Sequence, residues 1–136
     1  MSDNILDLLD KYQLELKNDI TIDEMNMKDR SLFITSIKHK WVGYLMRHKI
    51  DLKKLENGRE LMVNTISEQL LEKPDMQLSH AAVRRKAESH ETIIKVDEQI
   101  EGYKIIIEYL EKVEKVVNSM TWDLKNIIEL VKMETQ

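Results

Sequence analysis

Apolar residues recur at helical spacing from the start of the chain. The first apolar set lies on one face of a helix: Ile5, Leu8, Leu9 and Tyr12. This spacing predicts a short helix over residues 1–17, with Ser2 or Asp3 as its N-cap. Residues 18–23 (NDITID) then alternate apolar and polar side chains. They predict an extended linker in which Asp23 caps the following helix.

The segment from 24 to 73 predicts a long middle helix region. Its apolar residues share one broad face at 3.6-residue spacing: Phe33, Ile37, Trp41, Tyr44, Leu45, Leu52, Leu55, Met62, Ile66 and Leu70. Gly43 and the Asn57–Gly58 pair are weak breakers, so the segment is either one helix or two helices hinged near Gly58. The single proline, Pro74, ends it, and residues 74–79 are predicted to form a loop.

Residues 80–135 form the predicted C-terminal helix region. Alternating spacings of three and four define its heptad seam: Tyr103, Ile106, Leu110, Val113, Val117, Met120, Leu124, Ile127 and Val131. Such a seam packs against a partner helix. Ile105, Tyr109, Val116 and Ile128 widen the apolar surface, which favours a multi-helix bundle or an oligomer. We therefore predict a single all-α domain over 1–136, a helical bundle with a coiled-coil-like C-terminal oligomerisation helix.

Composition agrees with long helices. Charged residues make up 34% of the chain and hydrophobic residues 42%, with three Gly and one Pro. There is no Cys, which excludes disulfides and thiolate metal sites and suits a reducing compartment. The first ten residues are acidic, so no signal peptide is expected, and the apolar runs are too short to span a bilayer. We expect a cytoplasmic protein.

Charge is distributed in blocks, which the net charge of −4 conceals. Residues 28–59 hold nine Lys or Arg against three Asp or Glu, whereas residues 1–27 hold two against seven. Residues 37–54 (IKHKWVGYLMRHKIDLKK), the basic segment, carry two rows of cations on the predicted helix. The rows flank Trp41 and Tyr44: Lys40, Arg47 and Lys54 on one side, and Lys38, Lys49 and Lys53 on the other.

Three interpretations fit the basic segment. Its Lys and Arg stems could lie beside a core face that buries Trp41. It could instead be a groove that follows the phosphates of a single strand and offers Trp41 for stacking on bases. A basic amphipathic helix could also lie on anionic lipid. A second basic cluster, residues 84–86 (Arg84, Arg85 and Lys86), is either a solvated loop or helix start, or an extension of the same patch.

No sequence pattern indicates catalysis, a cofactor or a metal. His39 and His48 are nine residues apart and His80 and His90 ten apart, so neither pair shares a helix face at ligand spacing. His48 falls on the apolar face and is predicted to be a core histidine. Phosphate-binding glycine motifs and a nucleophile elbow are missing. We expect a protein that is not an enzyme and has no cofactor.

Four segments together resemble the UvsY family, the recombination mediators of T-even-like bacteriophages. They are LKNDITID (16–23), KW (40–41), IIKVD (93–97) and TWDLKNIIELVK (121–132), and the resemblance extends over nearly the whole chain. It implies a non-enzymatic homo-oligomer that binds single-stranded DNA in the cytoplasm of an infected host. It also implies that the protein helps a RecA-like recombinase of the UvsX type to displace single-strand-binding protein and form a filament.

The resemblance further implies that the C-terminal helix closes the oligomer into a ring. The family's Lys-Ala-Arg-Leu motif on the middle helix is replaced here by uncharged residues 64–67, and GREL (58–61) supplies Arg59 alone. The predicted DNA contacts are Lys38, Lys40, Trp41, Arg47, Lys49, Lys53, Lys54, Arg59, Arg84, Arg85 and Lys86. The alternative is a structural coiled-coil adaptor that binds protein and not DNA.

Overall fold

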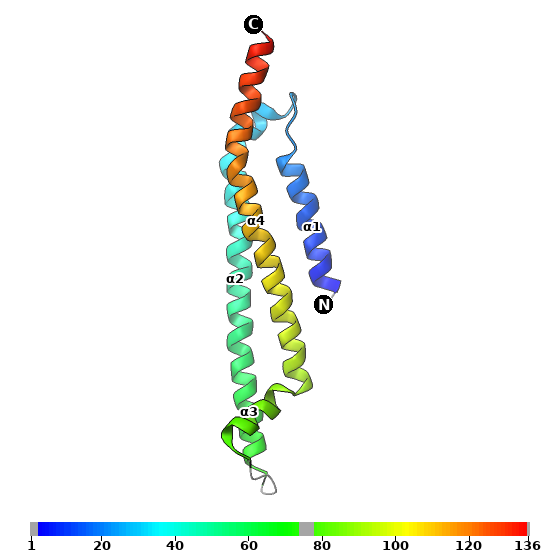
Figure 1. The fold of residues 1–136 in the computed structure, drawn as a ribbon, viewed down its shortest axis with the longest axis vertical. Coiled ribbons are helices and arrows are strands. Elements are labelled where there is room, and N and C mark those ends of the chain that lie inside the picture. The colour runs from blue at the N-terminus through cyan, green and yellow to red at the C-terminus, as the bar shows by residue number, and fades with distance from the viewer. Residues whose placement is uncertain (1–2, 74–77, 136) are drawn as a thin grey trace.

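The computed structural model describes residues 3–73 and 78–135, and these residues fold as helices joined by short connections (Figure 1). In chain order the helices are α1 (Asp3–Ile20), α2 (Met27–Leu71), α3 (His80–Glu88) and α4 (Glu91–Glu134). The described residues include no strand. The all-α fold predicted from the apolar periodicity is confirmed.

Two long antiparallel helices, α2 and α4, form the frame of the molecule (Figure 1). Helix α2 is continuous through Gly58, which decides between the one-helix and two-helix alternatives. At 1.5 Å per residue its 45 residues extend for about 67 Å. A helix of this length fixes the direction of every side chain along it relative to every other.

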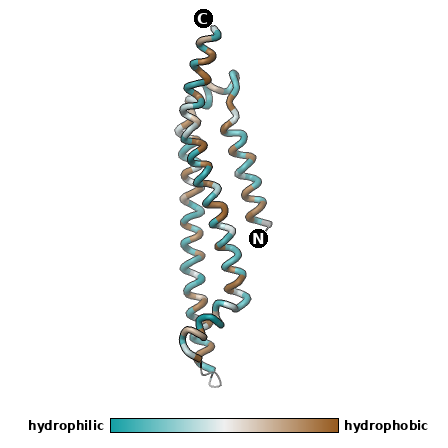
Figure 2. The backbone as a smooth tube through the Cα atoms, in the orientation of Figure 1, coloured by the Kyte–Doolittle hydropathy of each residue, from teal (hydrophilic) through white to brown (hydrophobic). Residues whose placement is uncertain are grey.

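The heptad seam of α4 packs against α2 of the same chain. Apolar positions recur along α4 between polar ones, as Figure 2 shows. Six seam residues are buried in the main core: Ile106, Leu110, Val113, Val117, Met120 and Leu124. They pack with Ile37, Trp41 and Leu45 of α2. Their assignment to an oligomer interface is therefore corrected, because the partner helix that the seam requires comes from its own chain.

Helix α1 lies alongside the α2–α4 pair and adds Ile5 and Tyr12 to the core. Its close approach to α4 depends on Gly102. A Cβ atom at position 102 would lie 2.7 Å from Cγ1 of Ile5, a distance that real Cβ atoms essentially never show. The absence of a side chain at this position therefore allows α1 to dock.

A smaller apolar cluster lies where α3 connects α2 to α4, at the end of the molecule away from the C-terminus (Figure 1). Val63, Ala87 and Ile93 form its buried centre. Ser79 is the N-cap of α3, and its hydroxyl accepts a hydrogen bond from the Ala82 amide. His90 is the N-cap of α4, and its Nδ1 accepts a hydrogen bond from the Thr92 amide. The predicted C-terminal helix region is therefore two helices, separated at residues 89–90.

Several predicted boundaries differ from the structure. Residues 18–20 are helical, so the predicted linker at 18–23 was wrong for its first half. Asp23 accepts hydrogen bonds from the Met25 and Asn26 amides within the connecting turn and does not cap α2, whose N-cap position is Asn26. Phe33 is 57% exposed and leaves the predicted apolar face. The N-cap predicted at Ser2 or Asp3 and the stop predicted at Pro74 lie outside the described residues and side chains.

We predict opposite effects of alanine at two helical glycines. A Cβ at Gly58 meets no atom within 4 Å, so Gly58→Ala should raise the free energy of unfolding by about 0.5–1 kcal/mol through helix propensity. Gly102→Ala should lower it by about 1 kcal/mol, because overpacking against Ile5 outweighs the same gain. Urea unfolding followed by circular dichroism measures both values.

Ile5→Ala provides the control for the second substitution. Removing the Ile5 side chain relieves the contact, so Gly102→Ala should no longer destabilise the protein in that background. Destabilisation that persists in the double variant would show that Gly102 matters for another reason.

Candidate nucleic-acid interface

The basic segment lies on α2, and several of its cations lie on the exposed flanks of that helix. Arg47, Lys53 and Lys54 are exposed, and no described residue forms an ion pair with them. Residues 30–50 contain no Asp or Glu at all. Asp51 and Glu56 are the acidic residues of α2 next to these cations, so three cations against two carboxylates leave a small net positive charge on this surface.

Trp41 belongs to the core, which corrects its prediction as a stacking residue for bases. The side chain is 1% exposed, and its indole Nε1 donates to Asp19 Oδ2 at 2.8 Å. The ammonium group of Lys40 donates to the same oxygen and lies 3.7 Å from Glu15 Oε1. Lys40 therefore compensates a buried carboxylate at the α1–α2 contact, and it is poorly placed to meet a phosphate.

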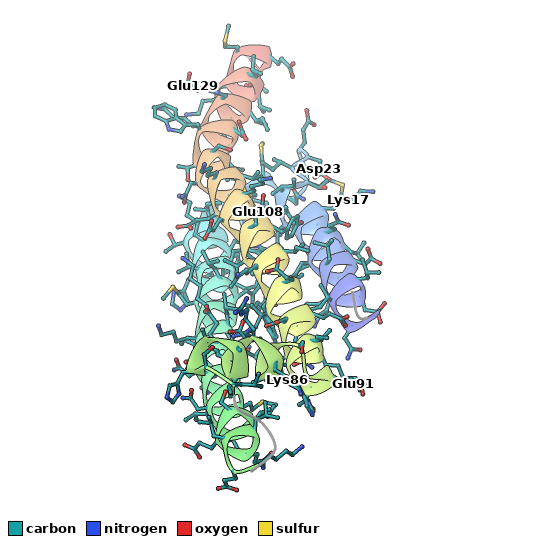
Figure 3. All side chains as sticks on the ribbon, turned by 60° about the horizontal axis from the view of Figure 1, so that its bottom comes forward. Lys17, Asp23, Lys86, Glu91, Glu108 and Glu129 are labelled. Carbon is teal, nitrogen blue, oxygen red and sulfur yellow. The ribbon has the colours of Figure 1, made fainter. Side chains whose placement is uncertain are left out.

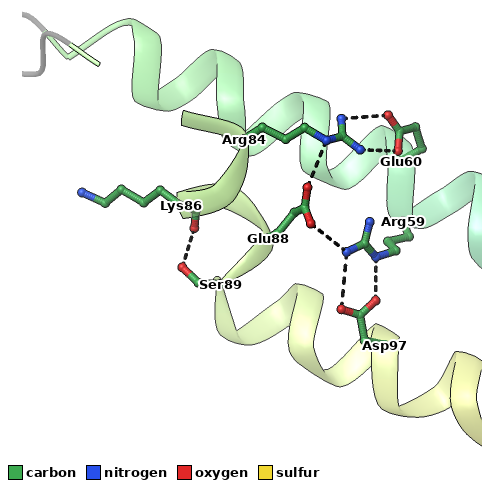
Figure 4. A network of polar contacts seen from close by, with 7 residues as sticks. All are labelled: Arg59, Glu60, Arg84, Lys86, Glu88, Ser89 and Asp97. Carbon is green, nitrogen blue, oxygen red and sulfur yellow. Dashed lines mark hydrogen bonds and ion pairs between the residues drawn. The ribbon is translucent and has the colours of Figure 1, made fainter. Parts of the chain in front are cut away.

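Arg59 and Arg84 also have partners within the chain, in an ion-pair network where α2, α3 and α4 meet, and Arg84 is exposed there (Figure 4). Arg59 donates through Nε to Asp97, and its other arm lies 3.6 Å from Glu88. Arg84 binds both oxygens of Glu60 at 3.0 Å and also contacts Glu88. The hydrogen bond to Asp97 raises the pKa of Arg59 by more than desolvation lowers it. Both predicted DNA contacts therefore already have carboxylate partners.

The remaining predicted contacts lie on the first half of α2 and on α3. Lys38 donates to the Thr121 hydroxyl at 2.7 Å, and Lys49 lies 3.7 Å from Glu111 in an exposed, weak pair. Arg85 and Lys86 are exposed on α3. In Figure 3 Lys86 lies at the same end of the molecule as Glu91, and Glu129 lies at the other end.

An aromatic cluster connects α1 to α2 directly behind the basic face. Tyr12 stacks on Tyr44 with ring centroids 5.0 Å apart and meets Trp41 edge-on at 5.8 Å. Its hydroxyl shares a 2.7 Å hydrogen bond with Nε2 of His48, which is 8% exposed. His48 is thus the predicted core histidine, although its Nδ1 has no partner among the described residues. Burial lowers the pKa of His48, and Arg47 lowers it further against the opposing effect of Asp51.

The C-terminal turns of α4 extend beyond the rest of the bundle (Figure 1). They expose several apolar side chains: Trp122 at 65%, Leu130 at 60% and Met133 at 72%. The last two seam residues, Ile127 and Val131, are half-buried, as is Tyr103 at the other end of the seam. A groove of about 370 Å³ beside this end is lined by residues of both long helices, including Ile34 and Ile128.

Two further findings limit the chemistry. No group of three or more His, Cys, Asp or Glu among residues 3–73 and 78–135 could hold a metal ion. Within the same residues, no helix has a stretch long and apolar enough to cross a bilayer.

Two long helices form a hairpin, α1 docks beside it, and exposed cations lie on α2, so the described residues define an all-helical protein. The family model described as "Recombination, repair and ssDNA binding protein UvsY" matches residues 15–135. The chain therefore belongs to the UvsY family.

Solved structures of the bacteriophage T4 recombination mediator protein UvsY share this fold. The lattice type IV crystal structure has a TM-score of 0.76 at 17% identity, covering 93% of this chain and 98% of the T4 chain. The lattice type II structure has a TM-score of 0.75 at 15% identity, covering 94% and 98%. No curated protein matches this sequence. At these identities the likeness establishes the fold, and residue roles must come from this chain.

Sequence reasoning missed two features of the interface. Asp19 was not recognised as the acceptor for Trp41, although a buried indole N–H normally requires one. The exposed residues between the two cation rows were also missed, because Trp41 and Tyr44 were expected there. The 3.6-residue period places those two on the core side and His39, Met46 and Ile50 outside.

We predict that His48 makes stability depend on pH. Its pKa in the folded protein lies below the value of 6.5 in the unfolded chain, so the unfolded state binds the proton first as pH falls. The contribution is complete above pH 6.5 and is lost as pH falls through the folded pKa. The melting temperature should therefore drop less between pH 7.5 and 5.5 in His48→Gln than in the wild type.

His39→Gln is the matched control, since His39 is exposed on the same helix. It should retain the pH dependence of the wild type. Equal dependence in the wild type and His48→Gln would show that another group is responsible.

Proposed function

We propose that this protein is a recombination mediator that binds single-stranded DNA and helps a RecA-like recombinase to replace single-strand-binding protein on the strand. The supporting observation is the outward face of α2, where Arg47, Lys53 and Lys54 are exposed and no described residue forms an ion pair with them. Membership of a family described by recombination, repair and ssDNA binding supports the same function. Neither the site nor the family gives reason to expect catalysis.

The proposed mechanism is electrostatic. Each phosphate that a Lys or Arg neutralises releases condensed counterions, so the free energy of binding comes largely from the ions set free. Three cations per chain give modest affinity, but several copies in one assembly multiply the effective concentration of sites along a strand. Holding the strand on such an assembly would loosen bound single-strand-binding protein and present the DNA to the recombinase.

Homo-oligomerisation is the second part of the proposal, and it uses the exposed end of α4 and not the buried part of the heptad seam. Trp122, Leu130 and Met133 provide apolar area there, and the half-buried Ile127 and Val131 lie on the same turns. A closed ring would be formed when this end of each chain binds its neighbour. Leu124, which is 3% exposed, is part of the monomer core and is unsuitable for testing the interface.

We predict that Arg47→Gln, Lys53→Gln and Lys54→Gln together weaken binding to labelled oligo-dT and flatten its salt dependence. Loss of three phosphate contacts should reduce the slope of log K against log[salt] by about 2 per chain. Fluorescence anisotropy across a series of salt concentrations measures both quantities. Circular dichroism should remain unchanged, because all three side chains are exposed.

A matched control removes three exposed lysines from α4, with Lys104→Gln, Lys112→Gln and Lys115→Gln. The net charge changes equally, so this variant separates a local contact from general attraction. An equal loss of affinity for oligo-dT in both variants would argue against a binding face on α2. If the wild-type protein does not bind oligo-dT at low salt, the adaptor alternative is favoured.

We also predict that Leu130→Glu with Met133→Glu yields monomers at concentrations where the wild type is oligomeric. The charges are placed on exposed turns, so the helical content should be retained. Sedimentation velocity provides the measurement, with Leu6→Glu and Leu14→Glu on the exposed side of α1 as control. An oligomer that survives the first pair but not the second would place the interface on α1.

A further inference from the structure

The outward side of α2 carries an uncharged stripe between its two rows of cations. The outer stripe consists of His39, Gly43, Met46 and Ile50, all exposed. At 3.6 residues per turn these positions fall within about 60° of one another, on the side opposite Trp41. Met46 is 49% exposed and Ile50 53%, and other apolar residues of α2, such as Leu32 and Leu61, are exposed as well.

Cations border the outer stripe on both edges. Lys49 and Lys53 follow one edge, and Arg47 and Lys54 follow the other. No acidic residue occurs within residues 30–50, and Asp51, which follows Ile50, places one negative charge near the edge formed by Arg47 and Lys54. A partner that fits this surface must combine negative charge with apolar faces.

Gly43, like Gly58 farther along α2, leaves the helix surface open, and Gly43 does so within the outer stripe. Its φ is not positive, and a Cβ there would meet no atom of the chain within 4 Å. Glycine is a poor helix former, so neither the backbone nor internal packing explains it in the middle of α2. An exposed position without a side chain does allow a ligand to approach the helix backbone.

We propose that the outer stripe is a base-contact site, on which the bases of a single strand lie while its phosphates meet the bordering cations. Every base has a flat apolar face, so contact with it does not depend on the DNA sequence. The side chains of His39, Met46 and Ile50 offer surfaces for this contact. The stripe is about 16 Å long from His39 to Ile50, which accommodates two or three nucleotides. This inference rests on the proposed function and assigns a non-electrostatic component to the same binding.

Oligo-dT and an abasic oligodeoxynucleotide of equal length test the proposal, since they share phosphates and sugars but differ in bases. The wild type should bind oligo-dT about tenfold more tightly than the abasic strand at every salt concentration. Met46→Gln with Ile50→Gln should reduce this preference to about twofold and leave the salt slope unchanged. Leu6→Gln with Leu14→Gln, a matched exposed pair on α1, should retain the full preference.

Four results would overturn the base-contact site. An unchanged preference in the Met46 and Ile50 variant would show that the bases lie elsewhere. A changed sedimentation coefficient with DNA affinity intact would identify the outer stripe as a contact between copies of this chain. Wild-type protein that binds neither strand would remove the proposed function together with this site, whereas equal, salt-sensitive binding of both strands would remove the site alone.

Discussion

One buried carboxylate determines which side of α2 faces outward. Asp19 is 7% exposed and accepts hydrogen bonds from the Trp41 indole and the Lys40 ammonium. A buried carboxylate is tolerated only with such partners, so any rotation of α2 that separated them would be strongly unfavourable. Because α2 is continuous from Met27 to Leu71, fixing its rotation at Trp41 also fixes the direction of Met46, Ile50 and Lys54.

The same constraint separates two kinds of basic residue. Lys40, Arg59 and Arg84 compensate carboxylates and hold α1, α2, α3 and α4 together. Arg47, Lys53 and Lys54 form no ion pair with any described residue and remain available to a polyanion. Charge density along the sequence cannot make this distinction. Asp97 lies far from its partner Arg59 in the chain, and Glu60 lies far from its partner Arg84. The folded contacts decide which cations are structural.

Apolar periodicity was sufficient to predict the helices, the all-α class and the core positions of α4. It could not identify the partner of the heptad seam, because the pattern specifies contact with a helix and says nothing about which chain supplies it. For the same reason Leu110 and Leu124 were assigned to an oligomer interface and lie in the monomer core. The break at residues 89–90 was missed since neither Ser nor His is a strong helix breaker.

Lysine acetylation footprinting of the wild-type protein, with and without oligo-dT, tests the division of basic residues most directly. Mass spectrometry reports each lysine separately in the intact assembly. The account predicts that DNA protects Lys53 and Lys54 while the reactivity of Lys40, Lys112 and Lys115 stays the same. Protection confined to Lys86 or to the lysines of α4, with Lys53 and Lys54 still reactive, would contradict it.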